Sequence, residues 1–194
     1  MLLDADVVVV GAGMCGLYAL KVLREQGLRV IVLEKGAGVG GTWFWNRYPG
    51  ARCDIPSLEY SFGFDPELEQ EWVWTEHFAS QPEIERYLNH LADRYDLRRD
   101  IRLSTGVSAM TFDEDTDTWI FDTETGEHFR ARFAVMATGG LSAPKDRRWP
   151  SRSSERAGVH PARSRSSRCR STRRTSRRSL RCRVGCRGAS RSDR

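Results

Sequence analysis

The chain has 194 residues and a net charge of +5, but this charge averages two very different parts. Residues 147–194 hold 17 Arg and only two acidic side chains, whereas residues 1–146 hold 14 basic and 24 acidic side chains. No run of about 18 apolar residues occurs, and five Cys are too few for a disulfide framework. The first ten residues also lack the basic start of a secretion signal, so we expect a cytoplasmic protein without a membrane span.

The first 35 residues have the pattern of a strand, a helix and a second strand. Asp6–Val10 is a nearly continuous β-branched run, as expected for a strand that is buried on both faces. Leucines then recur at helical spacing up to Gly27, a residue type that commonly ends a helix, and Arg29–Leu33 is a second apolar strand. Strands that alternate with helices in this way indicate a Rossmann-type α/β domain with a parallel sheet.

A glycine-rich turn joins the first strand to the helix. Gly11, Gly13 and Gly16 form Gly-x-Gly-x-x-Gly. The first glycine permits the turn, the second lets a pyrophosphate approach the backbone, and the third lets helix and strand pack closely. Glu34 ends the second strand, where a carboxylate accepts hydrogen bonds from ribose hydroxyls and repels a 2′-phosphate. The unit therefore predicts binding of FAD or NAD rather than NADP, and the alternative is a chance glycine turn.

The stretch GGTWFWNRYPGARCD, residues 40–54, indicates which dinucleotide to expect. It follows Glu34 after a short glycine-rich loop, so it must lie back near the same cofactor. It resembles the long fingerprint of the type I Baeyer–Villiger monooxygenases: Gly-Gly-x-Trp, four residues, aromatic-Pro-Gly, three residues and Asp. The resemblance is to the phenylacetone and cyclohexanone monooxygenase branch and covers about residues 5–144. The matching positions are Gly40, Gly41, Trp43, Tyr48, Pro49, Gly50 and Asp54.

The resemblance implies an FAD site with glycines at the ADP half and aromatic side chains at the flavin half. Indole rings there would shield the flavin from water, and Asp54, beside the isoalloxazine ring, would be the catalytic residue. For the tryptophans the alternative is plain core filling, and for Asp54 it is a carboxylate that caps a turn. The expected cofactor-binding residues are Gly11, Gly13, Gly16, Glu34, Lys35, Gly41, Thr42, Trp43, Trp45, Arg52, Cys53, Asp54, Tyr60 and Val107.

The resemblance also implies an activity for full-length relatives. NADPH reduces FAD, O2 adds to give a C4a-peroxyflavin, and this species converts a ketone into an ester or lactone. The NADPH and substrate domains would follow in later segments that this chain does not match, so we expect no turnover from the chain as given. The alternatives are an N- or S-oxidising flavin monooxygenase and a non-catalytic FAD-binding module.

Between residues 80 and 139 the pattern predicts one more helix and a small β-meander. Ser80-Gln81-Pro82-Glu83 has the form of a capping box, with Pro in the first turn, and opens a helix to about Asp96. Thr125-Gly126 marks a hairpin turn, and the acidic run 113–117 is expected to be a solvated loop without a metal ion. The expected strands are Ile101–Leu103, Val107–Phe112, Thr118–Asp122 and the buried run that starts at Phe133.

Residues 145–194 are expected to be a disordered Arg/Ser-rich tail, separate from an FAD-binding domain over residues 1–144. The tail has almost no large apolar residue and so cannot form a core. The absence of Lys, Phe, Tyr, Ile and Asn after Lys145 favours out-of-frame translation of a GC-rich gene. A nucleic-acid-binding tail is the alternative, but no aromatic residue follows Trp149 to stack on bases, so we expect at most non-specific binding to phosphates.

Overall fold

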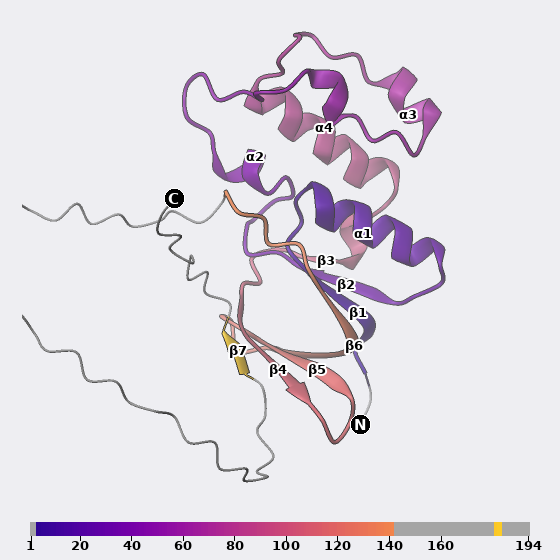
Figure 1. Ribbon diagram of the computed structural model, residues 1–194, viewed down its shortest axis with the longest axis vertical. Helices are drawn as coiled ribbons and strands as arrows, with labels where there is room; N and C mark the ends of the chain where they lie inside the picture. The colour runs from indigo at the N-terminus through magenta and orange to yellow at the C-terminus, as the bar shows by residue number, and fades with distance from the viewer. Residues whose placement is uncertain (1–2, 142–180, 184–194) are drawn as a thin grey trace, which may run out of the picture. The chain divides into compact units, whose positions relative to one another are not determined.

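The computed structural model describes residues 3–141 and 181–183, which belong to one compact unit (Figure 1). The strands form one sheet in the order β3-β2-β1-β6-β5-β4-β7. No helix within these ranges is long and apolar enough to cross a membrane. In chain order the elements are β1 (Ala5–Val10), α1 (Met14–Glu25), β2 (Val30–Leu33), α2 (Thr42–Trp45), the 3-10 helix η1 (Ser57–Tyr60), α3 (Pro66–Glu71), α4 (Gln81–Arg94), the 3-10 helix η2 (Arg98–Asp100), β3 (Ile101–Arg102), β4 (Val107–Asp113), β5 (Thr118–Thr123), β6 (His128–Met136) and β7 (Arg181–Arg183).

β1 is the centre of the parallel half of the sheet. It pairs in parallel with β2 on one edge and with β6 on the other. Val7 and Val9 belong to the core cluster that includes α1, whereas Val8 and Val10 belong to a second cluster against the other face. The predicted strand that is buried on both faces is therefore confirmed, because alternate side chains of one strand point to opposite faces.

β6 joins the parallel half of the sheet to an antiparallel meander. Its first residues pair antiparallel with β5, which pairs antiparallel with β4, and its last residues pair in parallel with β1. Ala131 lies in both ladders, opposite Ala5 of β1 and Trp119 of β5. β6 begins at His128, earlier than the apolar run that predicted it from Phe133. The predicted Rossmann-type α/β fold with a small β-meander is confirmed.

The segment between β2 and β3 builds a helical region that packs against α1. Leu17 and Leu20 of α1 share one buried cluster with Ile84, Leu88 and Leu91 of α4, so α1 lies between the sheet and α4 (Figure 1). The apolar stripe of α4 is thus part of the core. Partly buried aromatic rings pack against this cluster; they are Tyr60, Phe62, Phe64, Trp72, Trp74 and Tyr95.

The start of α4 differs from the predicted capping box. Ser80 is the N-cap residue, but its side chain makes no cap hydrogen bond among the described residues. The carboxylate of Glu83 instead accepts hydrogen bonds from the Thr75 N–H at 2.8 Å and from the Thr75 hydroxyl at 2.9 Å. Glu83 is buried, and the loop before α4 offers it two donors, so the side chain turns to that loop rather than back to the helix start.

Strand β7 lies in the tail for which the sequence predicted no regular structure. Its backbone pairs antiparallel with β4, with Cys182 opposite Met110. An edge strand has unpaired N–H and C=O groups that can pair with an extended segment of almost any sequence, which explains why this one was not predicted. The rest of the predicted tail, residues 145–180 and 184–194, lies outside the described residues.

Candidate functional site at the glycine turn

Close contacts among protein atoms shape the glycine turn at two of its three glycines. Gly11 follows β1 with φ +105°, and an added Cβ there would lie 2.6 Å from the Ala137 carbonyl oxygen. At Gly16 an added Cβ would lie 1.9 Å from the Gly11 carbonyl oxygen. No side chain fits at such distances, so both positions require glycine whether or not a cofactor binds.

Gly13, the second glycine of the motif, has more room. It is the N-cap residue of α1, in extended backbone with φ −79°. The nearest atom to an added Cβ, among described residues other than its chain neighbours, is the Gly41 Cα at 3.5 Å. This is an ordinary contact distance, so protein packing alone does not demand glycine here. Because its N-cap residue is a glycine, α1 has no capping side chain at that position.

The second glycine-rich loop lies directly against this turn. Gly41 has φ +55°, and an added Cβ there would lie 2.9 Å from the Gly13 Cα. The Gly40 N–H donates to the Ala12 carbonyl oxygen at 2.9 Å. Thr42, half-buried, begins α2 immediately after Gly41. The predicted return of the Gly40–Asp54 stretch to the glycine turn is thus present in the structure.

Glu34 links the two loops from the end of β2. It is only 5% exposed, and its Oε2 accepts a hydrogen bond from the Ala12 N–H at 2.6 Å. Its Oε1 accepts from the Gly36 N–H, also at 2.6 Å. Sequence reasoning assigned this carboxylate to a ribose and missed its role in holding the protein's own backbone. Each carboxylate oxygen can accept a second hydrogen bond, so both roles are compatible.

Lys35 and Val107 lie near the end of β2, which carries Glu34. The Thr105 N–H donates to the Glu34 carbonyl oxygen at 2.8 Å, which brings the start of β4, and with it half-buried Val107, beside the end of β2. Lys35 is exposed and forms an ion pair with Glu124 at 2.8 Å. Three of the expected cofactor-binding residues, Glu34, Lys35 and Val107, are therefore neighbours in space.

Phe44 holds the loop between β2 and α2, a role that sequence reasoning did not find. An added Cβ at Gly36 would lie 2.9 Å from its ring, and one at Gly38 would lie 2.8 Å from it. Arg47 stacks on this ring, with its guanidinium carbon 4.8 Å from the ring centroid. The Gly-x-Gly spacing of residues 36–38 was the available signal, because two glycines so close together make room for a ring.

The two tryptophans of α2 lie in different environments. Trp43 is 8% exposed and packs edge-on against Tyr60, with 5.6 Å between ring centroids, whereas Trp45 is 46% exposed. Trp43 is thus part of the core, as the alternative of core filling expected, although its ring edge meets another predicted site residue. Burial raises the pKa of the Tyr60 hydroxyl, and electrostatic interaction with the nearby Cys53 and Asp54 side chains raises this pKa further.

The residues after the Tyr-Pro-Gly turn point in several directions. Arg52 is exposed; its guanidinium donates to Glu76 at 2.8 Å and to the Phe78 carbonyl oxygen at 2.9 Å. The hydrogen bond to Glu76 raises the pKa of Arg52. Cys53 is buried, and its N–H donates to the backbone of the loop before α4, whereas Asp54 is exposed. Arg52 therefore serves the protein's own loop in this structure.

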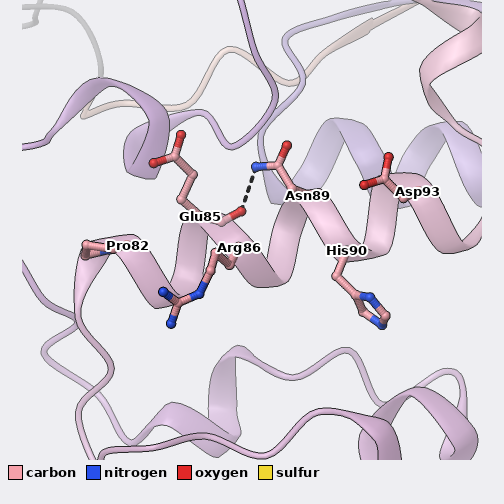
Figure 2. Close-up of a pocket in the computed structure, with 6 residues that line it drawn as sticks. All are labelled: Pro82, Glu85, Arg86, Asn89, His90 and Asp93. Carbon is pink, nitrogen blue, oxygen red and sulfur yellow. Dashed lines mark hydrogen bonds between the residues drawn. The ribbon is translucent and has the colours of Figure 1, made fainter.

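A surface hollow of about 510 Å³ lies away from the glycine turn, along α4 (Figure 2). Figure 2 shows Glu85 and Asp93 on one side of the helix and Arg86 and His90 on the other. None of the predicted site residues lines it, and its rim is charged and open. Cofactor pockets are mostly apolar and enclosed, so we do not assign this hollow to a cofactor.

Comparison with known proteins relates this geometry to a family. Residues 9–73 match a family described as an NAD(P)-binding Rossmann-like domain. The chain is 48% identical over 148 residues to an acetone monooxygenase (methyl acetate-forming) of Gordonia sp. (strain TY-5). It is 45% identical over 141 residues to a Baeyer–Villiger monooxygenase of Pseudooceanicola batsensis. This chain is a homologue of the N-terminal part of the Baeyer–Villiger monooxygenases.

Two further relatives show how much of each protein the similarity covers. A phenazine N-monooxygenase of Lysobacter antibioticus is 46% identical over 138 residues. An oxidised steroid monooxygenase bound to NADP has 57% identity and a TM-score of 0.68, over 70% of this chain and 26% of that one. The alignments with the three sequence relatives cover 71–76% of this Baeyer–Villiger homologue. They cover only 26–28% of each relative, so the chain spans about a quarter of the relatives' length.

Proposed function

We propose that the N-terminal domain of this homologue binds FAD across the carboxyl ends of β1 and β2. We further propose that it serves an FAD- and NADPH-dependent monooxygenase that oxidises a ketone with O2 to an ester or lactone. The carboxyl ends of parallel strands are where open α/β sheets bind nucleotides. The proposal includes a cytoplasmic location, which the free thiols of Cys15 and Cys53 support.

The observation that carries the proposal is the room left at Gly13. Gly11 and Gly16 are required by protein contacts, but an added Cβ at Gly13 meets nothing closer than 3.5 Å among the described atoms beyond its chain neighbours. A ligand that approaches this backbone closely would explain why residue 13 is a glycine. The start of α1 beside it offers N–H groups and the positive end of a helix dipole, which suit a pyrophosphate.

The other residues fit an extended dinucleotide on both sides of that point. Glu34 retains acceptor capacity for ribose hydroxyls, with Lys35 and the Val107 backbone next to it, as the adenosine half requires. On the other side, Gly41 and Thr42 lead to the tryptophans. The proposed FAD-binding set is therefore Gly11, Gly13, Gly16, Glu34, Lys35, Gly41, Thr42, Trp43, Trp45, Arg52, Cys53, Asp54, Tyr60 and Val107.

At the flavin half the chain's own residues exclude water and set the local charge. Bound FAD would carry electrons from NADPH and activate O2. Exposed Trp45 is free to cover the ring system, while Trp43 and Tyr60 form the packed wall behind it. Exposed Asp54 places a carboxylate at the same end, where we propose that it acts as the catalytic residue.

A second candidate function is N-oxidation, because a phenazine N-monooxygenase is 46% identical to this homologue. The Tyr48-Pro49-Gly50 turn with Asp54 four residues beyond it favours the ketone reaction, since it follows the Baeyer–Villiger fingerprint. Side-by-side assays of NADPH consumption with a ketone and with an aromatic N-heterocycle, on the protein encoded by the full gene, separate the two. Ester formation from the ketone is the expected result.

The direct test of the FAD site is titration of the purified chain with FAD, followed by flavin fluorescence and absorbance. We expect saturable binding with one FAD per chain and no comparable binding of free riboflavin, because the pyrophosphate and adenosine contacts are the ones best supported. Equal, weak binding of both compounds would contradict the proposal.

A further inference from the structure

The short helix α2 depends on other parts of the protein for its conformation. It is a single turn of four residues, too short to be stable by itself. Like every helix end, it leaves carbonyl oxygens without intrahelical partners. Asn46 satisfies the Thr42 carbonyl oxygen with its backbone N–H and with its side-chain amide, both at 2.9 Å. The Trp43 carbonyl oxygen needs a donor from outside α2.

That donor is the side-chain amide of Gln81, at the start of α4. Gln81 Nε2 donates to the Trp43 carbonyl oxygen at 2.5 Å and to Glu85 Oε2 at 2.8 Å. Gln81 is only 6% exposed, so losing either bond would leave a polar group buried without a partner. One amide group thus joins the backbone of the tryptophan-bearing turn to a carboxylate on α4.

The same network returns to the segment after α2. The second oxygen of Glu85, Oε1, accepts a hydrogen bond from Arg47 at 2.5 Å, and Arg47 stacks on the Phe44 ring. The path runs from the Trp43 carbonyl through Gln81 and Glu85 to Arg47, and so holds α2 at both its helical turn and its exit.

The backbone of Gln81 also fixes the later part of the same stretch. Its N–H donates to the Ala51 carbonyl oxygen at 2.8 Å, and Arg52 and Ser80 form an isolated antiparallel bridge. The Cys53 N–H donates to the Ala79 carbonyl oxygen at 3.0 Å. Gln81 therefore contacts both the tryptophan turn and the strand-like segment that leads to Asp54.

We propose that Gln81 is a positioning residue, which sets the orientation of the tryptophan wall and of the segment leading to Asp54 at the flavin half of the site. This inference rests on the proposed FAD site. Gln81 makes no hydrogen bond to the glycine turn among the described residues, and acts through the Trp43 carbonyl and the Ala51 backbone. Its role needs an amide, because a donor must face a carbonyl and a carboxylate at the same time.

The test compares Gln81→Met with Asn89→Ala in the full chain. Gln81→Met keeps the length of the side chain but removes both donors. Asn89→Ala is the matched control, since Asn89 is an amide on the same helix whose side chain donates to the Glu85 carbonyl oxygen and accepts from Arg98 at 2.7 Å, with no described hydrogen bond to residues 40–54. We expect Gln81→Met to raise the Kd for FAD about tenfold, the effect of about one lost buried hydrogen bond, and to increase the fluorescence of bound flavin. The control should show neither change.

A measurement on the FAD-free chain tests the positioning role of Gln81 separately from the proposed FAD site. In the FAD-free chain, Gln81→Met should speed amide hydrogen exchange of residues 42–46 at least about tenfold and alter the near-UV circular dichroism of the tryptophans, with far-UV dichroism unchanged. If the wild-type chain fails to bind FAD, the proposed function is wrong, while exchange still reports whether Gln81 positions α2. Unchanged exchange and unchanged flavin fluorescence in Gln81→Met would overturn the role of Gln81.

If Gln81→Met does not fold, Gln81→Asn provides the same test with a shorter amide. Wild-type behaviour of Gln81→Asn would also overturn the positioning role of Gln81.

Discussion

Gly13 and Gly41 meet backbone to backbone, so that a Cβ added to Gly41 would lie 2.9 Å from the Gly13 Cα. The contact joins two glycine-rich loops that are 28 positions apart in the sequence. It brings the turn after β1 and the start of the tryptophan helix to one point. Glu34 accepts from the Ala12 N–H next to this point, and α2, which carries Trp43 and Trp45, begins directly after it.

Gly13→Ala is expected to weaken FAD binding at least about tenfold and to leave the fold intact, because the added methyl group meets ligand rather than protein. Gly16→Ala is the matched variant with the opposite expectation. Its Cβ would lie 1.9 Å from the Gly11 carbonyl oxygen, so the apo chain itself should lose stability. FAD titration and urea unfolding of both variants check this. Equal loss of stability in the two variants would contradict the distinction.

Glu34→Gln is expected to destabilise the chain by about 1–3 kcal/mol, because one buried backbone N–H would then face an amide donor. It should also weaken FAD binding. Glu83→Gln is the matched control, since Glu83 is an equally buried carboxylate that accepts from Thr75 in the α4 region. It should lose similar stability but keep the wild-type Kd for FAD. A parallel loss of FAD affinity in both variants would show that stability alone controls binding.

Trp43→Ala and Trp45→Ala should distinguish a tryptophan that packs in the protein core from one that shields the bound flavin from solvent. Trp43 is buried, and its removal is expected to cost about 3–5 kcal/mol of unfolding free energy. Trp45 is 46% exposed, and its removal should change stability by less than about 0.5 kcal/mol. Trp45→Ala is expected to weaken FAD binding only slightly, because the glycine turn and Glu34 remain, and to leave the bound flavin brighter and easier to quench with iodide. Unchanged quenching would mean that Trp45 does not cover the flavin.

Acid should weaken the start of α3 through Asp65. The hydrogen bond from the Tyr95 hydroxyl, aided by the Glu67 and Leu68 N–H groups and by Arg94, lowers the pKa of Asp65 below its ordinary value of 3.8. Since the folded pKa is the lower one, this contribution is present above about pH 4 and is lost as the pH falls through the folded value. Urea unfolding of Asp65→Asn should therefore show a deficit at pH 7 that shrinks below pH 4.

The control for Asp65 is Glu67→Gln. Glu67 also pairs with Arg94, at 3.3 Å, but its side chain is 84% exposed, so its removal should change stability little. A deficit in Asp65→Asn that stays constant down to pH 2.5 would contradict the assignment.

The source DNA tests the prediction of an out-of-frame tail. Translation past Pro144 in the other two frames should restore the continuation of the Baeyer–Villiger pattern, including a second Gly-x-Gly-x-x-Gly. If neither frame contains this second glycine motif, the out-of-frame explanation is wrong, and the many arginines of residues 147–194 must have another origin.

The sequence predicted those parts of the fold and site that depend on local rules. The β-branched run at Asp6–Val10, the glycine turn and the acid at the end of β2 follow from periodicity and backbone sterics, which are visible within a few residues. The partners of Gln81 and Glu83 could not be predicted in this way, since Trp43 lies in α2 and Thr75 in the loop before α4, and only the folded chain brings them near α4. The capping box shows the same limit, because a buried carboxylate takes the donors that the tertiary structure offers.

The placement of β6 beside β1 has a consequence for how the chain folds. Ala5 pairs with Ala131, so the first strand must wait for nearly the whole domain to be synthesised before both of its edges are paired. Such long-range parallel pairing slows folding and leaves hydrophobic strands exposed in the meantime. Nascent chains that stop before residue 131 should recruit chaperones and aggregate, whereas those that extend past Met136 outside the ribosome should become protease-resistant in one step.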